Sequence, residues 1–147
     1  MHHPAELAIN QYLEDATSGK STMSEETILQ IGTDVMDAMR RQFGGGKGRD
    51  EFRLRMSNIG KPTCQLWFAK NKPEEALPKP TTFVMNMLLG DIVEAAFKGI
   101  IKEAGYPYED KDNFVSLELG GATIKGSYDI VVDGAMDDVK SASDWSY

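Results

Sequence analysis

The sequence lacks the features of secreted and membrane-spanning proteins. Its 147 residues include a single cysteine, Cys64, so no internal disulfide can form, which is typical of proteins from a reducing compartment. No apolar run reaches the roughly 18 residues that a membrane span requires. The N-terminal segment has neither the basic start nor the apolar stretch of a signal peptide. We therefore expect a cytoplasmic protein that has no membrane partner.

Positive charge is scarce and unevenly distributed. The net charge is −7, yet residues 40–72 hold nine Lys or Arg and only two Asp or Glu, a local charge of +7 against −14 in the remainder. Such an asymmetry is a better guide to partners than the total, and here it favours nucleic acid. A solvated, flexible basic loop is the simpler interpretation and stays open.

The rest of the composition is that of one soluble globular domain. Apolar residues make up 41% and charged residues 27% of the chain, which is enough apolar material for a core. Hydrophobic periodicity predicts four helices, over residues 5–14, 21–43, 61–71 and 81–105. In the second helix, Thr22 and Glu25 have the spacing of a capping box. Its expected buried stripe is Ile28, Ile31, Val35 and Met39.

Alternating patterns after the last helix predict three strands, over residues 113–119, 122–133 and 135–142. Asp133-Gly134 is a hairpin turn between the last two strands. The predicted fold class is therefore α/β in the broad sense, of the α+β kind. We divide the chain into a helical N-terminal region with a basic Gly-rich connector, residues 1–52, and a region that holds the long helix and the strands, residues 53–147.

Carboxylates lie unexpectedly on the predicted hairpin. In its first arm, Asp129 points to the face opposite Ile130. In its second arm, Asp138 and Lys140 share one face and Val139 points to the other. Because the arms are adjacent, Asp129 can face the Asp138/Lys140 pair. Two carboxylates so placed repel each other unless a cation lies between them, and a divalent cation with oxygen ligands fits.

A third carboxylate lies on the predicted long helix. Glu94 shares an apolar stripe with Ile101, and burying an unpaired carboxylate costs on the order of several kcal/mol. Gly90 lies one turn earlier on the stripe, where the missing side chain lets another element approach. Asp91 is a competing candidate, but its stripe becomes polar and predicts a solvated side chain.

Glu94, Asp129 and Asp138 together can form a hard-cation site, with Lys140 beside it. A surface ion pair between Asp138 and Lys140 is the simpler interpretation, because an Asp-x-Lys motif alone is very weak. The order of the motifs favours the site: a helix Glu, then a strand Asp, then Asp-x-Lys on the paired strand.

This order resembles the PD-(D/E)xK nuclease superfamily, in the branch of RecB-type and lambda-type exonucleases, over residues 53–147. Glu94, in LGDIVEAAF, matches the helix acid of that family. Asp129, in KGSYDIVVDG, matches the acid of the second motif, although a Tyr stands before it where Pro is common. Asp138 and Lys140, in DDVKSAS, match the third motif. The resemblance implies a restriction-endonuclease-like core, in which a mixed β-sheet packs against the long helix.

The resemblance also implies phosphodiester hydrolysis with one or two Mg²⁺ or Mn²⁺ ions. Asp129, Asp138 and the backbone carbonyl of Val139 would hold the metal, and Glu94 would bind it directly or through water. Lys140 would orient the nucleophile or stabilise the pentavalent state. We expect a DNA exonuclease of recombination or end processing, of phage origin, in the cytoplasm of a bacterial host or a phage-infected cell.

In these relatives the N-terminal part walls the DNA channel, so the basic segment is expected to contact DNA. Arg53, Arg55 and Lys61 are the candidates for phosphate contacts. Trp67 or Phe68 can stack on a base, although core packing is the expectation for both.

Some family features are missing. A helix, often with Gln-x-x-x-Tyr, and a further strand would follow the third motif, but the chain ends at Tyr147. A fragment, a shortened protein or completion by another chain would each account for this. The open sheet edge predicts a partner chain, a strand swap or a homo-oligomer. Iron–sulfur members have a cysteine near the place of Cys64, but one cysteine cannot hold a cluster, so we expect a buried thiol.

Three functions stay open. The leading one is a metal-dependent DNA exonuclease, the second a catalytically incomplete module for nucleic-acid binding or assembly, and the third a structural metal-binding domain. A nuclease assay on linear and circular DNA separates the first from the others. Binding in EDTA, titrated with salt, separates the second from the third.

Overall fold

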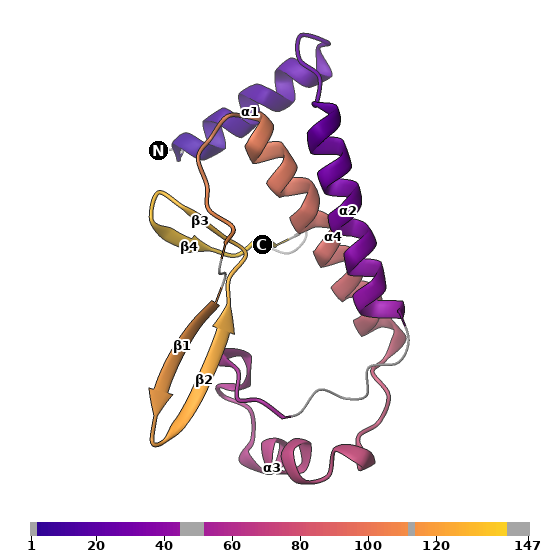
Figure 1. The fold of residues 1–147 in the computed structure, drawn as a ribbon, viewed down its shortest axis with the longest axis vertical. Helices are drawn as coiled ribbons and strands as arrows, with labels where there is room; N and C mark the ends of the chain where they lie inside the picture. The colour runs from indigo at the N-terminus through magenta and orange to yellow at the C-terminus, as the bar shows by residue number, and fades with distance from the viewer. Residues whose placement is uncertain (1–2, 45–51, 112–113, 141–147) are drawn as a thin grey trace.

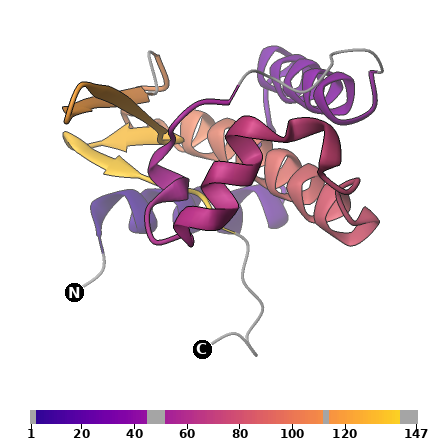
Figure 2. The same cartoon turned by 90° about the horizontal axis from the view of Figure 1, so that it is seen from below.

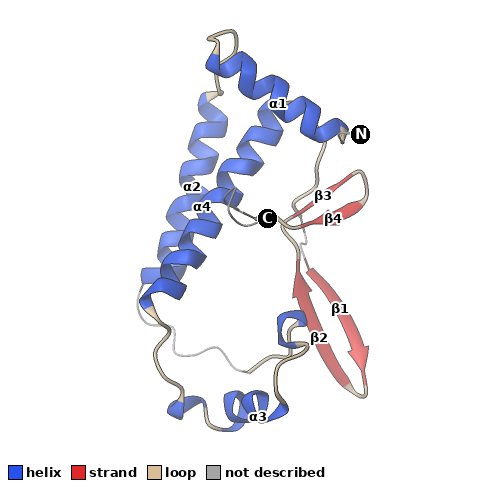
Figure 3. Cartoon of the chain, turned by 180° about the vertical axis from the view of Figure 1, so that it is seen from behind, coloured by secondary structure: helices blue, strands red, loops and turns tan. Residues whose placement is uncertain are grey.

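The computed structural model describes residues 3–44, 52–111 and 114–140. Within these ranges the elements follow in the order α1 (Pro4–Thr17), α2 (Glu25–Phe43), η1 (Met56–Asn58), α3 (Thr63–Asn71), η2 (Pro73–Glu75), α4 (Thr81–Glu103), β1 (Phe114–Leu119), β2 (Ala122–Ser127), β3 (Ile130–Val132) and β4 (Ala135–Asp137). Helices α1, α2 and α4 lie together, α3 lies at the opposite end, and the strands lie along one side (Figures 1 and 3). Seen from below, both strand pairs lie on the side away from α2 (Figure 2). The α+β class and the four helices are confirmed.

The strands form two separate antiparallel pairs, β1–β2 and β3–β4. The expectation of one mixed sheet is therefore wrong for the described part of the chain. The predicted strand over 122–133 breaks at Tyr128–Asp129, because its first half pairs with β1 and its second half turns back at Asp133-Gly134 to pair with β4. That hairpin turn is confirmed: both residues have positive φ, 50° and 78°, as a two-residue type I′ turn requires.

The core lies where the β3–β4 hairpin meets α4 and α1. Ile101 of α4 and Ile130 of β3 are 1% and 2% exposed, and they cluster with Val132 and Ala5. Ala5 belongs to α1, so the helical N-terminal region shares this core with the region that holds the long helix and the hairpin. The boundary at 52/53 stays a prediction, and most of the Gly-rich connector lies outside the described residues.

Helix α2 packs on α4 through Thr27 and through part of the predicted stripe, because Ile31 meets Gly99 whereas Ile28 and Met39 are 45% and 47% exposed. Its cap is Ser24, whose side chain accepts from the Thr27 N–H at 3.3 Å, so the predicted Thr22–Glu25 capping box is wrong. Thr27 is fully buried and donates its hydroxyl to Glu103, which also accepts from Ser24 Oγ at 2.6 Å. These bonds lower the pKa of Glu103. These hydrogen bonds therefore attach the start of α2 to the end of α4. They place Thr27, and not Ile28, at the interface between the two helices.

The close approach of helices occurs at Gly99 and not at Gly90. A Cβ atom at Gly99 would lie 3.1 Å from Thr27 Cγ2 and 2.8 Å from Ile31 Cγ1, whereas a Cβ at Gly90 would meet nothing within 4 Å. The expectation that Gly90 admits another element is wrong within the described residues. None of the helices there combines the length and the hydropathy that a membrane crossing needs.

We predict that Gly99→Ala lowers the free energy of unfolding and that Gly90→Ala raises it. Either change adds about 1 kcal/mol of helix propensity in the interior of α4. At Gly99 this gain is offset by about 1–3 kcal/mol of overpacking against α2, whereas at Gly90 it remains. Urea denaturation of both variants measures the difference, and equal stabilities would contradict the close contact of α2 with α4.

Candidate functional site

The β3–β4 hairpin brings two of the predicted acids together. Asp129 precedes β3, and its Oδ2 accepts from the Val139 N–H at 2.6 Å. Its carboxyl group also lies within hydrogen-bonding contact of Asp138. Val139 packs its side chain against the core, as the alternation predicted. Strand β4 ends at Asp137, however, so the third motif follows the strand instead of lying within it, and the predicted strand beyond residue 140 lies outside the described residues.

Lys140 lies beside this pair. Its Nζ is 2.5 Å from Asp138 Oδ2, and both side chains are largely exposed. The hydrogen bond to Asp138 is the main cause of a raised pKa for Lys140, and the charges of Asp138, Asp129 and Glu94 contribute. The surface ion pair that was the simpler interpretation is therefore present.

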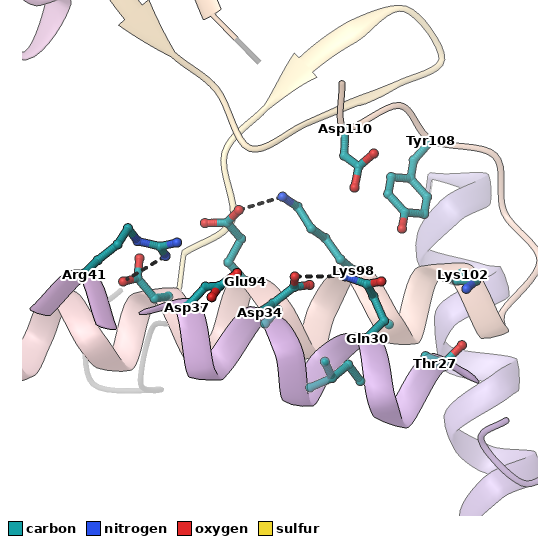
Figure 4. A pocket seen from close by; sticks show the side chains of 14 residues that line it. Thr27, Gln30, Asp34, Asp37, Arg41, Glu94, Lys98, Lys102, Tyr108 and Asp110 are labelled. Atoms are coloured by element: carbon teal, nitrogen blue, oxygen red, sulfur yellow. Dashed lines mark hydrogen bonds and ion pairs between the residues drawn. The ribbon is translucent and has the colours of Figure 1, made fainter. Parts of the chain in front are cut away.

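Glu94, on α4, is the third acid of the group formed with Asp129, Asp138 and Lys140, which we call the acidic cluster. The Glu94 carboxylate is, however, already paired. Its Oε1 is 2.7 Å from Lys98 Nζ, an ion pair whose i,i+4 spacing was visible in the sequence and was missed. Figure 4 shows both side chains extending from α4 on the side of the strand segments. The competing Asp91 pairs with Arg41 at 3.3 Å, and its side chain is 23% exposed against 31% for Glu94. The expectation of a solvated Asp91 is wrong.

The environment of the acidic cluster shifts the pKa values of Asp129 and Asp138 in opposite directions. Burial raises the pKa of Asp129, and the negative charges of Glu94 and Asp138 raise it further, while the Val139 N–H opposes them. The pKa of Asp138 is lowered, chiefly by its hydrogen bond with Lys140. As the pH falls, a proton is therefore taken up by Asp129 before Asp138.

The carboxylates fit a hard cation as a pair but not as a triad. Among the side chains that the structure describes, no group of three or more His, Cys, Asp or Glu is arranged to hold a metal ion. Mg²⁺ is usually held by one or two carboxylates, with water and substrate oxygens completing the shell. Asp129 and Asp138 offer these oxygens in direct contact, whereas Lys98 holds Glu94 to one side.

Two cavities flank the cluster. A polar one of about 270 Å³ lies between α2 and α4 and is lined by Glu94, Lys98 and Asp91 (Figure 4). A more apolar one of about 650 Å³ lies between α1, α4 and the β3–β4 hairpin, and Asp138 and Lys140 line it. The acidic cluster therefore borders one cavity on each side of α4.

The predicted phosphate-binding residues also converge. Arg53, Arg55 and Lys61 are exposed and line one cavity of about 350 Å³, between the extended segment before η1 and α3. Arg55 forms a parallel bridge with Lys125 of β2, a basic residue that the sequence did not single out. Sequence alone gave no signal for Lys125, because it lies 70 residues beyond Arg55.

The apolar residues of α3 are exposed, which corrects three expectations. Trp67 and Phe68 are each 53% exposed, and Cys64 is an exposed free thiol. Helix α3 has no buried residue within the described chain, so it lacks the opposing layer that would cover these side chains.

Comparison of the chain with protein-family models, with curated proteins and with solved structures gives no match. The resemblance to PD-(D/E)xK nucleases therefore stays a prediction from the motifs. Functional inference rests on the carboxylate pair, the adjacent lysine and the basic cavity.

We predict that Asp129→Asn raises the free energy of unfolding in EDTA at neutral pH by about 0.5–2 kcal/mol. The change removes a half-buried charge that faces two other acids, and an amide oxygen can still accept from Val139 N–H. Because the pKa of Asp129 is raised on folding, the wild type regains stability as the pH falls through it, so the difference should shrink in acid.

Urea denaturation at neutral and mildly acid pH measures this effect. Asp137→Asn removes an exposed carboxylate on β4 and is the matched control, with an expected change within about 0.5 kcal/mol. Equal stabilisation by both variants, or a gain that persists in acid, would contradict the charge crowding at Asp129.

Proposed function

We propose that the chain is a metal-dependent DNA nuclease that hydrolyses phosphodiester bonds, an exonuclease of recombination or end processing. The observation that carries the proposal is the convergence of Asp129 and Asp138 at the β3–β4 hairpin, where Asp129 accepts from the Val139 N–H at 2.6 Å and Lys140 lies 2.5 Å from Asp138. Paired acids with an adjacent amine suit phosphoryl chemistry, because the substrate is an anion and develops further negative charge. A phage origin and a cytoplasmic location belong to the same proposal.

Asp129 and Asp138 are the residues that would hold Mg²⁺ or Mn²⁺, and Glu94 and the Val139 carbonyl are further candidates. Such an ion, when bound, lowers the pKa of its water and neutralises charge on the phosphate. Lys140 brings a positive charge to the exposed side of the pair, where it can contact a phosphate oxygen or position the nucleophile. The Val139 N–H orients the Asp129 carboxylate through its 2.6 Å bond.

A restriction-endonuclease-like core belongs to this proposal as well. It is supported by the order of a long helix and an acid-bearing hairpin, and by the docking of that hairpin on α4 through Ile101 and Ile130. The division of the strands into two pairs is a departure from the single mixed sheet of that core.

Exposed apolar residues support a partner for the chain. Strand β1 is exposed along its whole length, including Leu117 and Leu119 on the face that it shares with Ile124 of β2. We infer that a partner chain or a second copy covers this face, because large exposed apolar patches usually mark an interface.

A module that binds nucleic acid without cutting it is the second candidate. This candidate is favoured because each of the three acids already has a donor within the chain. The donors are Lys98 for Glu94, the Val139 N–H for Asp129 and Lys140 for Asp138. Retained DNA binding in EDTA, without cleavage in Mg²⁺ or Mn²⁺ by the wild-type chain, would select this candidate. Cleavage of linear but not circular DNA would select the exonuclease.

Lys140→Ala is expected to reduce cleavage at least about 10²-fold and to leave metal binding nearly intact. Its amine carries charge to the phosphate but is no metal ligand. The measurements are nucleotide release from labelled linear DNA and Mn²⁺ binding by calorimetry. Lys20→Ala, an exposed lysine between α1 and α2, is the control and should retain the wild-type rate. Wild-type turnover by Lys140→Ala would contradict the family assignment.

Replacing Arg53, Arg55 and Lys61 together with Ala should flatten the salt dependence of DNA binding. The log–log slope should fall by up to about 0.9 for each phosphate contact that is lost on duplex DNA. Binding is measured with Ca²⁺ in place of Mg²⁺, so that cleavage is blocked. The control replaces Lys20, Lys79 and Lys102, which removes the same charge outside residues 40–72. Equal slopes for the two triple variants would show that the basic segment is merely solvated.

A further inference from the structure

Helix α3 presents an aromatic pair to solvent. The Trp67 and Phe68 rings meet edge to face, with their centroids 5.2 Å apart, and each residue is 53% exposed. Tryptophan is on average among the well-buried residues, so a half-exposed pair on a short helix calls for a ligand or a covering layer.

One cation of α3 lies next to this pair, and it shares a cavity with cations from two other segments. Lys70 follows Trp67 by three residues, so the two side chains are neighbours on the helix surface. Lys70, Arg53 and Lys125 line one cavity of about 340 Å³. Lys125 is brought there by β2, whose Lys125 N–H donates to the Leu54 carbonyl at 3.1 Å. None of these three cations forms an ion pair with an acid in the part of the chain that the structure describes.

The same strand leads to the acidic cluster. Lys125 stands four residues before Asp129, a separation of at most about 13 Å along an extended chain. This length matches the rise of about four stacked nucleotides. A strand of nucleic acid held at Lys125 would therefore reach the carboxylates within a few nucleotides.

We propose that α3 and this cavity form a binding site for single-stranded DNA, in which a base stacks on Trp67 and Lys70, Arg53 and Lys125 contact phosphates. The proposal deepens the nuclease function and rests on it only for the choice of DNA as ligand. Aromatic faces beside a cationic groove are how proteins bind single strands, whereas a duplex keeps its bases stacked away from such a platform. A protein partner fits less well, because interface cores are depleted in Lys.

Trp67 supplies the readout. The sequence has two tryptophans, so the full chain with Trp145→Phe reports on Trp67 alone. Its fluorescence is titrated in EDTA with a short oligothymidylate and with a duplex of the same length. We expect quenching by the single strand at lower concentration than by the duplex. Lys70→Ala and Lys125→Ala should each weaken binding and reduce its salt dependence, and Lys20→Ala should not.

The contribution of the ring is measured by anisotropy of a labelled oligothymidylate. Trp67→Ala should lower the affinity about 5- to 100-fold, and Trp67→Phe should retain most of it because an aromatic face remains. Phe43→Ala removes an aromatic residue of similar exposure, 56%, from the end of α2 and is the matched control, with no expected change. Circular dichroism verifies that each variant keeps its helix content.

Three results would overturn the proposal: no quenching by the single strand, equal quenching and affinity for the duplex, or an equal effect of Trp67→Ala and Phe43→Ala. Loss of self-association in Trp67→Ala by sedimentation, without quenching by DNA, would identify α3 as a protein-binding surface instead. Because every measurement is made without metal, failure of the nuclease proposal at Lys140 leaves this test unaffected.

Discussion

The contact of Ile101 with Ile130 holds the rest of the site in place. These two side chains form the most deeply buried part of the core, and Val139 packs against the same cluster. Asp129 directly precedes Ile130 and accepts from the Val139 N–H, so the burial of Ile130 and Val139 fixes the position of Asp129. Glu94 lies seven residues before Ile101, which is about two turns along the same face of α4. The apolar contact therefore sets the spacing of the acids, although no acid takes part in it.

Charge crowding is the consequence of that contact, and the chain relieves it with its own donors. Lys98 neutralises Glu94, Lys140 pairs with Asp138, and the Val139 N–H bonds to Asp129. Each donor also competes with a bound cation for carboxylate oxygens. The competition is weakest at the Asp129–Asp138 pair, because Lys140 is exposed and can swing away, whereas Lys98 is only 18% exposed. A hard cation is therefore expected to bind between the two hairpin acids first, and Glu94 joins only if Lys98 releases it.

The sequence predicted those features that depend on local periodicity. Alternation placed Ile130 and Val139 in the core, and Asp133-Gly134 gave the turn. What it missed depends on long-range packing. The partner change at Tyr128–Asp129 depends on which strand lies alongside. Likewise, Gly99 and Gly90 look alike in sequence, and only the position of α2 distinguishes them. Whether Trp67 is buried depends on a covering layer, which hydrophobicity alone cannot reveal.

Strand β2 connects the basic part of the chain with the acidic part. This strand carries Lys125 beside the basic segment and leads four residues later to Asp129, so it joins the positive and negative parts of the chain. A DNA backbone that binds Arg53 and Lys125 is repelled by the carboxylates within about one Debye length of those cations. The Debye length is about 10 Å at 0.1 M salt. Under the proposed function, a divalent cation between Asp129 and Asp138 would remove that repulsion. DNA could then bind the basic end with or without metal. It could bind the acidic end only when the metal is present, so DNA would contact the acids only when the site is able to cleave it.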